Sequence, residues 1–229
     1  MKINNSEIFC LIPARGGSKR VKNKNIQIFK KKPLVWHTIN FAKKLNNTHI
    51  VLSTDSKKIY GICLKFIKID GLRPKRLAND LTTTFDVAKY ELLKTEKKNN
   101  CKFKYILLLQ PTVPFRRFLE IKKAIKYIKD KKIDSVTTIA NVGSFHPERM
   151  KLLKNNKIFN FNNSKTENMK PLQLLKKVYI RSGSIYLIKR SAFFKYKSFV
   201  GRSCRGIIVK DKFAINIDTY SDLELAKIY

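Results

Sequence analysis

The chain has 229 residues, of which 43% are hydrophobic, so we predict a single α/β domain over residues 1–229 with a packed core. It has no apolar run near the roughly 18 residues of a membrane span, and residues 1–7 show no small-residue cleavage site, so we expect neither a membrane anchor nor a signal peptide. The net charge of +34 invites a nucleic-acid partner, but only 11 of the 50 basic residues are Arg and the 39 lysines are spread along the whole chain, which favours compositional drift over specific nucleic-acid recognition.

The first half of the chain alternates short apolar runs with amphipathic stretches. Residues 8–12, 50–52 and 105–109 are apolar runs that end in polar or turn residues, as expected of fully buried strands. Residues 33–45 place their apolar side chains on one helical face, and Pro33 is suited to the first position of that helix. The pattern predicts a strand, a helix and a second strand in succession.

The alternation continues with helices at about 85–97 and 121–128, and with strands at 184–188 and 207–209. Strand–helix–strand alternation implies a mostly parallel sheet that is covered on both faces. Between residues 141 and 177, Asn and Lys dominate and apolar residues are sparse. This stretch is either an excursion from the sheet or a small lobe.

A terminal helix is predicted at residues 221–228. Ser221 is a plausible N-cap, and Glu224 stands three residues later, as in a capping box.

The four cysteines are widely scattered, with no Cys-x-x-Cys pair and no clustered histidines. Neither a disulfide framework nor a zinc site is indicated, and a reducing, cytoplasmic location fits best.

The strongest chemical signal follows the first predicted strand. Gly16 and Gly17 are adjacent there, and Arg15 and Lys19 flank them with positive charge. In open α/β sheets, ligands bind beyond the carboxyl ends of the strands, and paired glycines let backbone N–H groups turn toward a phosphate. The segment is neither a Walker A loop nor a Gly-x-Gly-x-x-Gly loop, so the residues alone leave open a phosphate site or a simple tight turn.

Six further sequence blocks follow one another along the chain: Ile12-Pro13-Ala14-Arg15-Gly16-Gly17-Ser18-Lys19 with Lys24-Asn25-Ile26 and Lys32-Pro33-Leu34, Ser53-Thr54-Asp55, Leu72-Arg73-Pro74 with Leu77-Ala78-Asn79-Asp80 and the threonines Thr82, Thr83 and Thr84, Leu109-Gln110-Pro111-Thr112-Val113-Pro114-Phe115-Arg116, Tyr179-Ile180-Arg181-Ser182-Gly183-Ser184-Ile185-Tyr186, and Ile215-Asn216-Ile217-Asp218-Thr219. In this order the blocks resemble the acylneuraminate cytidylyltransferases, the CMP-sialic acid synthetases, over almost the whole chain from Ile8 to Ala226. The resemblance implies a Rossmann-like nucleotidyltransferase fold, with residues 141–180 as a dimerisation lobe.

The resemblance also implies roles for single residues. Arg15 and Lys19 are expected to hold the CTP triphosphate and Lys24 to approach it, so these three are the candidate catalytic residues. The implied CTP-binding set is Ala14, Arg15, Gly16, Gly17, Ser18, Lys19, Asn25, Arg73 and Thr84. For the sugar, the resemblance implies Gln110 and Tyr186.

Asp218 matches a Mg²⁺-binding aspartate of the family, and Asn216 stands where an aspartate is commoner. Mg²⁺ takes one or two carboxylates together with water and substrate oxygens, and Mn²⁺ is an alternative. Taken alone, Asp218 is more simply explained as a residue that complements the dipole at a helix start.

Three residues keep open alternatives. His146 is a candidate for the sugar pocket, the dimer lobe or general-base catalysis, and a lone His is most often structural. Arg116 and Arg117 suit either an anionic ligand or a solvated helix start.

The expected reaction joins CTP to a free nonulosonic acid of the sialic-acid type and releases pyrophosphate, as in the biosynthesis of cell-surface glycans. The alternative acceptors are Kdo, pseudaminic acid and legionaminic acid. A basic nucleic-acid-binding module is the alternative outside enzymes. We expect a homodimer in which His146 or Arg149 reaches the partner's sugar pocket.

Overall fold

The computed structural model describes residues 7–162, 164 and 167–229. The prediction of no signal peptide concerns mainly residues 1–6, which lie outside the described residues. Within the described part of the chain, no helix is both long and apolar enough to cross a membrane.

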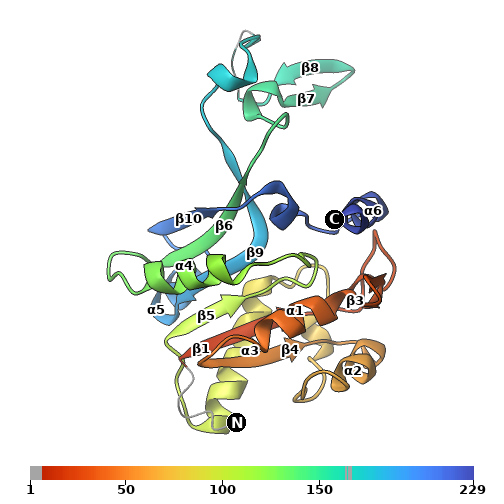
Figure 1. Ribbon diagram of the computed structural model, residues 1–229, viewed down its shortest axis with the longest axis vertical. Helices are drawn as coiled ribbons and strands as arrows, with labels where there is room; N and C mark the ends of the chain where they lie inside the picture. The colour runs from red at the N-terminus through yellow and green to blue at the C-terminus, as the bar shows by residue number, and fades with distance from the viewer. Residues whose placement is uncertain (1–6, 163, 165–166) are drawn as a thin grey trace.

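A six-stranded sheet with the order β10-β6-β9-β5-β1-β4 forms the centre of the molecule (Figure 1). Its strands are β1 (Ile8–Pro13), β4 (Thr48–Ser53), β5 (Tyr105–Leu108), β6 (Ser135–Asn141), β9 (Tyr179–Lys189) and β10 (Cys204–Ile208). Strand β1 is parallel to β4 and to β5, and β10 is parallel to β6. Strand β9 is antiparallel to both of its neighbours. The predicted α/β class with a mostly parallel sheet is confirmed.

Helices cover both faces of the sheet, because the strands of its centre are apolar on both faces. The helices are α1 (Leu34–Ala42), α2 (Lys57–Leu64), α3 (Thr84–Asn99), α4 (Phe118–Ile128), α5 (Arg190–Tyr196) and α6 (Tyr220–Ile228). On β1, Cys10 and Ile12 pack in a core with α1, α2 and α4. Phe9 and Leu11, on the opposite face, pack in a second core with α3 and α5. This alternation is the period of two that a strand imposes.

The helices and strands predicted from periodicity are all present, with shifted ends. Helix α1 stops at Ala42 rather than at residue 45, and α3 runs from Thr84 to Asn99 rather than from 85 to 97. Helices α2 and α5 were not predicted. Helix α2 begins at the N-cap Ser56, whose Oγ accepts a hydrogen bond from the Ile59 N–H.

The predicted capping of the last helix is wrong. The N-cap of α6 is Thr219, whose Oγ1 accepts from the Asp222 N–H at 3.2 Å, while Asp222 accepts from the Thr219 N–H at 2.7 Å. Ser221 therefore lies inside the first turn and not at its cap. The Asp222 carboxylate also accepts from the Asp218 N–H, so this capping box orients the backbone of a candidate metal ligand.

Between β6 and β9 the chain carries a hairpin of β7 (Lys151–Lys154) and β8 (Lys157–Asn160), which stands away from the sheet in Figure 1. Asn155 and Asn156 form its turn with φ of 49° and 57°, the left-handed values that a tight hairpin turn needs.

The remaining elements are short. They are β2 (Ile28–Phe29), β3 (Lys32–Pro33) and the 3₁₀ helices η2 (Lys24–Ile26), η3 (Lys75–Leu77), η4 (Pro147–Arg149), η5 (Leu172–Leu174) and η6 (Asp211–Ala214).

Candidate functional site

A cleft of about 540 Å³ opens beyond the carboxyl ends of β1, β4 and β5. The chain leaves β1 for β4 on one side and later returns to β5 on the other, so the cleft lies where a ligand is expected in an open α/β sheet. Its lining is rich in cations and hydroxyl groups and consists of Pro13, Arg15, Ser18, Lys19, Arg20, Lys24, Asn25, Arg73, Leu77, Ala78, Asn79, Thr82, Thr83, Thr84, Val87, Gln110, Pro111, Thr112 and Asp218.

The structure brings together most of the predicted site residues. Nine of them line this one cleft: Arg15, Ser18, Lys19, Lys24, Asn25, Arg73, Thr84, Gln110 and Asp218. They come from segments of the chain separated by up to two hundred residues, so the fold rather than the local sequence assembles the site.

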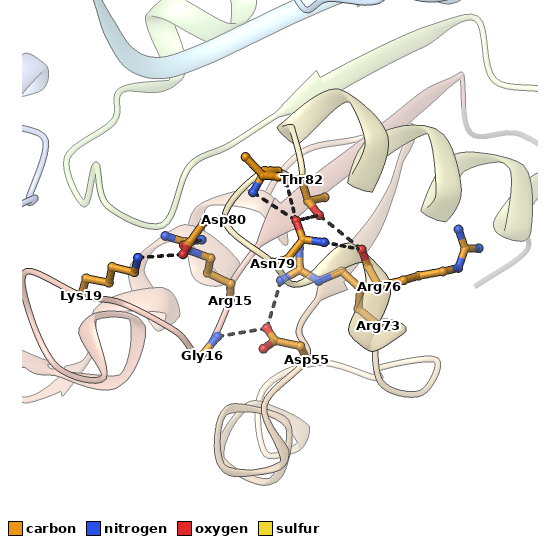
Figure 2. Close-up of polar contacts among 10 residues, drawn as sticks. Arg15, Gly16, Lys19, Asp55, Arg73, Arg76, Asn79, Asp80 and Thr82 are labelled. Carbon is orange, nitrogen blue, oxygen red and sulfur yellow. Dashed lines mark hydrogen bonds and ion pairs between the residues drawn. The ribbon is translucent and has the colours of Figure 1, made fainter.

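The two cations expected at the triphosphate share one carboxylate. Arg15 Nη1 lies 3.2 Å from Asp80 Oδ1, and Lys19 Nζ lies 2.7 Å from Asp80 Oδ2 (Figure 2). The hydrogen bond from Lys19 and the charges of both cations hold the pKa of Asp80 below its usual value. Asp80 lies in the loop between η3 and α3, and no role was predicted for it from the sequence.

Gly16 differs from its expected role. Its N–H donates to Asp55 Oδ1 at 3.0 Å and its carbonyl accepts from the Ser18 N–H at 2.9 Å, so these groups are engaged within the protein (Figure 2). A Cβ on Gly16 would lie 2.7 Å from the Cβ of Ser56, the N-cap of α2. Gly16 is thus required for close packing against α2, whereas a Cβ on Gly17 would meet open space.

A second network joins the loops after β1 and β4. The Arg73 side chain is 4% exposed, and its Nη2 donates at 3.0 Å to the same Asp55 oxygen that accepts from Gly16 (Figure 2). Arg73 Nε is buried, and it has no hydrogen-bond partner among the residues that the structure describes. A buried guanidinium with an unused donor at the wall of a cleft is suited to bind a polar ligand.

Of the two candidate metal ligands, Asp218 lines the cleft and Asn216 does not. Lys24 Nζ, on a side chain that is 15% exposed, lies 2.7 Å from Asp218 Oδ1. Asn216 Nδ2 donates to Asp218 Oδ2 at 2.8 Å. Asn25 is buried and donates from Nδ2 to the Arg15 carbonyl at 2.9 Å, so it positions the start of the glycine loop.

On the Gln110 side of the cleft, strand β9 approaches the loop that follows β5 closely. Gly183 in β9 has a φ of +76°, and a Cβ there would lie 2.6 Å from Gln110 Oε1. Arg116 holds the backbone of Gln110 in place. Its Nη2 donates to the Gln110 carbonyl at 2.5 Å, its Nε to the Ser184 carbonyl and its Nη1 to Thr38 Oγ1, both at 2.9 Å.

Arg116 therefore braces the cleft through three protein acceptors, and burial lowers the pKa of its guanidinium to about 9. Arg117 is bonded to Glu120 and lies over the ring of Phe213. Both arginine side chains therefore make contacts within the protein and are not simply solvated at the start of a helix.

Two residues predicted for the sugar lie elsewhere. Tyr186 is buried in the core beside Phe199, with ring centroids 6.4 Å apart, and burial raises the pKa of its hydroxyl. His146 is buried in the excursion from the sheet, where Nε2 is 2.9 Å from the Lys176 carbonyl and Nδ1 accepts from the Glu148 N–H. Both ring nitrogens of His146 thus have a local structural use, and its predicted sugar contact stays a prediction.

Of the other predicted residues, Ala14 is fully buried behind the cleft, and its N–H pairs with the Ser53 carbonyl. Asn216 contacts the cleft only through Asp218. Sequence reasoning missed the roles of Asp55, which directly follows β4, and of Asp80, which lies between η3 and α3, although both belong to the quoted sequence blocks.

A family model described as cytidylyltransferase matches residues 9–207. The chain is 31% identical over 228 residues to the CMP-N,N'-diacetyllegionaminic acid synthase of Legionella pneumophila, an alignment that covers 96% of this chain and 94% of that protein. It is 29% identical to the N-acylneuraminate cytidylyltransferase of Streptococcus agalactiae over 93% of this chain, which spans about half, 51%, of that protein's length.

Among solved structures, a CMP:2-keto-3-deoxy-manno-octonic acid synthetase complexed with CTP superposes with a TM-score of 0.68. The match covers 97% of this chain and 98% of that chain at 16% identity, so it shows a shared fold.

Proposed function

Because this chain belongs to the cytidylyltransferase family, we propose that it transfers CMP from CTP to the anomeric hydroxyl of a nonulosonic acid and releases pyrophosphate. The observation that carries the proposal is the grouping of Arg15, Lys19 and Lys24 around one cleft at the carboxyl edge of the sheet. Three cations in one cleft suit a triphosphate, and the names of the relatives in legionaminic and sialic acid chemistry support an acidic nine-carbon acceptor.

At the α-phosphorus, the reaction forms one P–O bond and breaks another. The anomeric oxygen attacks the α-phosphorus, the bond from that phosphorus to the bridging oxygen breaks, and pyrophosphate leaves while the hydroxyl proton passes to solvent. Arg15, Lys19 and Lys24 neutralise the charge that develops on the leaving phosphates, and the cleft holds the two substrates in line. Electrostatics and positioning supply most of the catalysis in such a site.

We assign the divalent cation to Asp218, with Asn216 beside it. The described residues contain no group of three or more His, Cys, Asp or Glu side chains that could hold a metal by themselves. One carboxylate and one amide oxygen still fit Mg²⁺, or Mn²⁺ in its place, because this ion takes one or two carboxylates and completes its shell with water and substrate phosphates. Bound there, the ion would polarise phosphate oxygens, and Asp218 would orient it.

The proposed acceptor is an acidic sugar, and we assign Gln110, which lines the cleft, to its recognition. Sialic acid, legionaminic acid, pseudaminic acid and the eight-carbon acid Kdo are the candidates. Membership of an enzyme family favours this function over the alternative of a basic nucleic-acid-binding module. The surface charge then serves to attract two anionic substrates.

A homodimer through residues 141–180 is also part of the proposal. Large apolar side chains are well exposed in this segment: Phe145, Leu153, Ile158, Phe159, Phe161, Met169 and Leu174. Leu153 pairs with Ile158 across the β7–β8 hairpin, so these two exposed side chains lie side by side, and exposed apolar side chains that gather in this way indicate an interaction surface. Sedimentation should show a dimer that Leu153→Asp with Ile158→Asp dissociates, while Ile228→Asp, at an exposed position of α6, leaves it intact. A parent chain that is monomeric at all concentrations would refute the dimer.

A cytoplasmic location completes the proposal, and the four free cysteines support it.

The function is tested by pyrophosphate release from CTP with Mg²⁺ and a panel of nonulosonic acids and Kdo, with ATP, GTP and UTP as nucleotide controls. We expect release with CTP and one or a few of the acids. Lys19→Ala should lose most of this activity, whereas Lys22→Ala, an exposed lysine outside the cleft, should keep it. Equal activity of Lys19→Ala and the parent would reject the phosphate assignment.

A further inference from the structure

Asp80 divides its two oxygens between the two cations assigned to the triphosphate. Oδ1 pairs with Arg15 at 3.2 Å and Oδ2 with Lys19 at 2.7 Å (Figure 2). A carboxylate that bridges two cations through separate oxygens has the same relation to them as two oxygens of a phosphate group. Asp80 is therefore the anion at this site in the structure.

The loop that carries Asp80 is held together by bonds that do not involve Asp80. Asn79 Oδ1 accepts from the Leu81 N–H and from the N–H and Oγ1 of Thr82, and Asn79 Nδ2 donates to the Arg76 carbonyl (Figure 2). Thr83 then caps α3. The Asp80 side chain is 56% exposed, so it can leave the two cations without disrupting these bonds.

The cations are free to exchange partners as well. The side chains of Arg15 and Lys19 are 44% and 76% exposed. Exposed ion pairs of this kind are weak and exchange readily, and a pyrophosphate group carries more charge and more oxygens than one carboxylate. Phosphate therefore displaces Asp80, while Asp80 stays tethered next to the site.

We propose that Asp80 is an internal competitor of pyrophosphate: it holds Arg15 and Lys19 when no phosphate is bound and returns to them as pyrophosphate leaves. The proposal rests on the proposed function, since it concerns the product of that reaction. Asp80 therefore weakens the binding of pyrophosphate, and the release of this product becomes faster. A tethered competitor raises the apparent dissociation constant by the reciprocal of the fraction of time that it leaves the site free, here about three- to tenfold.

The test is calorimetric titration of inorganic pyrophosphate, with Mg²⁺, into the parent, Asp80→Asn and Asp70→Asn. Asp70 is the matched control, because it is an aspartate of similar exposure, 52%, that pairs with Lys98 outside the cleft. Both substitutions remove one negative charge, so the control corrects for net charge. Asp80→Asn should bind pyrophosphate about three- to tenfold more tightly than Asp70→Asn. Asp80→Glu, which keeps the charge, should stay near the parent.

A dissociation constant for Asp80→Asn equal to or weaker than that of Asp70→Asn overturns the proposal, as does the absence of pyrophosphate binding in all variants. Weaker binding would mean that Asp80 is part of the phosphate site rather than its competitor. The titration and the activity assay distinguish this proposal from the proposed function. If Asp80→Asn binds pyrophosphate more tightly than Asp70→Asn but no sugar acid supports pyrophosphate release from CTP, only the proposed reaction is wrong.

Discussion

The Nζ atom of Lys24 lies 2.7 Å from Oδ1 of Asp218, across 194 positions of sequence. An ammonium group therefore neutralises the carboxylate to which we assign a divalent cation. A cation that binds Asp218 must share it with Lys24 or displace Lys24 toward the phosphates, so the lysine and the metal site are linked through one side chain.

Replacing Asp218 by Asn should lower Mg²⁺-dependent turnover about a hundredfold or more, because it removes the charge that holds the ion and orients Lys24. The Asp218 side chain is 43% exposed, so the fold should persist. Turnover titrated against Mg²⁺, with a thermal melt as a check of folding, measures this. An unchanged Mg²⁺ midpoint would place the metal elsewhere and leave Asp218 as a helix-start residue.

Replacing Asn216 by Asp should have the opposite effect on the metal. The hydrogen bond from Asn216 Nδ2 to Asp218 is lost, and two carboxylates then face each other beside Lys24. Repulsion between them is relieved by a divalent cation, so the Mg²⁺ midpoint should fall while turnover is kept. A midpoint that rises would show that Asn216 is needed as an amide.

Gly16 and Gly17 should respond differently to the same change. Gly16→Ala places a Cβ 2.7 Å from that of Ser56 and should cost about 1–3 kcal/mol of unfolding free energy, with weaker CTP binding because Arg15 shifts. Gly17→Ala meets nothing within 4 Å and should change stability by no more than about 0.5 kcal/mol. Urea denaturation and nucleotide titration compare the two. Equal effects would contradict the packing role of Gly16.

Asp55 and Arg73 should be energetically coupled. A double-mutant cycle with Asp55→Asn and Arg73→Gln should give a coupling free energy of about 1–3 kcal/mol, because Arg73 is buried and loses its counter-ion in the first variant. Denaturant unfolding of the parent, both single variants and the double variant measures it. Additive effects would mean that the contact contributes nothing to stability.

Single alanine substitutions distinguish the two candidate N-caps of α6, Thr219 and Ser221. Thr219→Ala should cost about 1 kcal/mol, since it removes the acceptor of the Asp222 N–H, and Ser221→Ala should be close to neutral. The reverse order, measured by urea denaturation, would restore Ser221 as the cap.

Most of the sheet could be predicted because β1 and β5 are buried on both faces and therefore read as unbroken apolar runs. Helix α2 was missed because it carries two lysines at its start and Gly61 inside, so its apolar face is narrow. The cap of α6 was misplaced because Thr219-x-x-Asp222 and Ser221-x-x-Glu224 are both capping-box patterns, and sequence alone does not rank them.

The motif blocks located the cleft, but they also pointed to side chains that do not line it. Tyr186 points into the core because strand β9 puts it on the same face as Ile188, and a shift of one residue reverses that orientation. The pairing of Asp80 with Arg15 joins residues 65 positions apart through a loop, and no local pattern specifies such a contact.

The antiparallel strand β9 also has a consequence for how the chain folds. Strands β6 and β10 reach the rest of the sheet only through β9, since β6 pairs with β9 and β10 and not with β5. During synthesis, β1, β4 and β5 can pair once residue 108 has emerged, but the edge of β5 stays open until residues 179–189 follow. Long-range pairing of this kind is slow and leaves an unpaired edge exposed in the meantime. Truncation before residue 179 should therefore yield a chain that aggregates through β5.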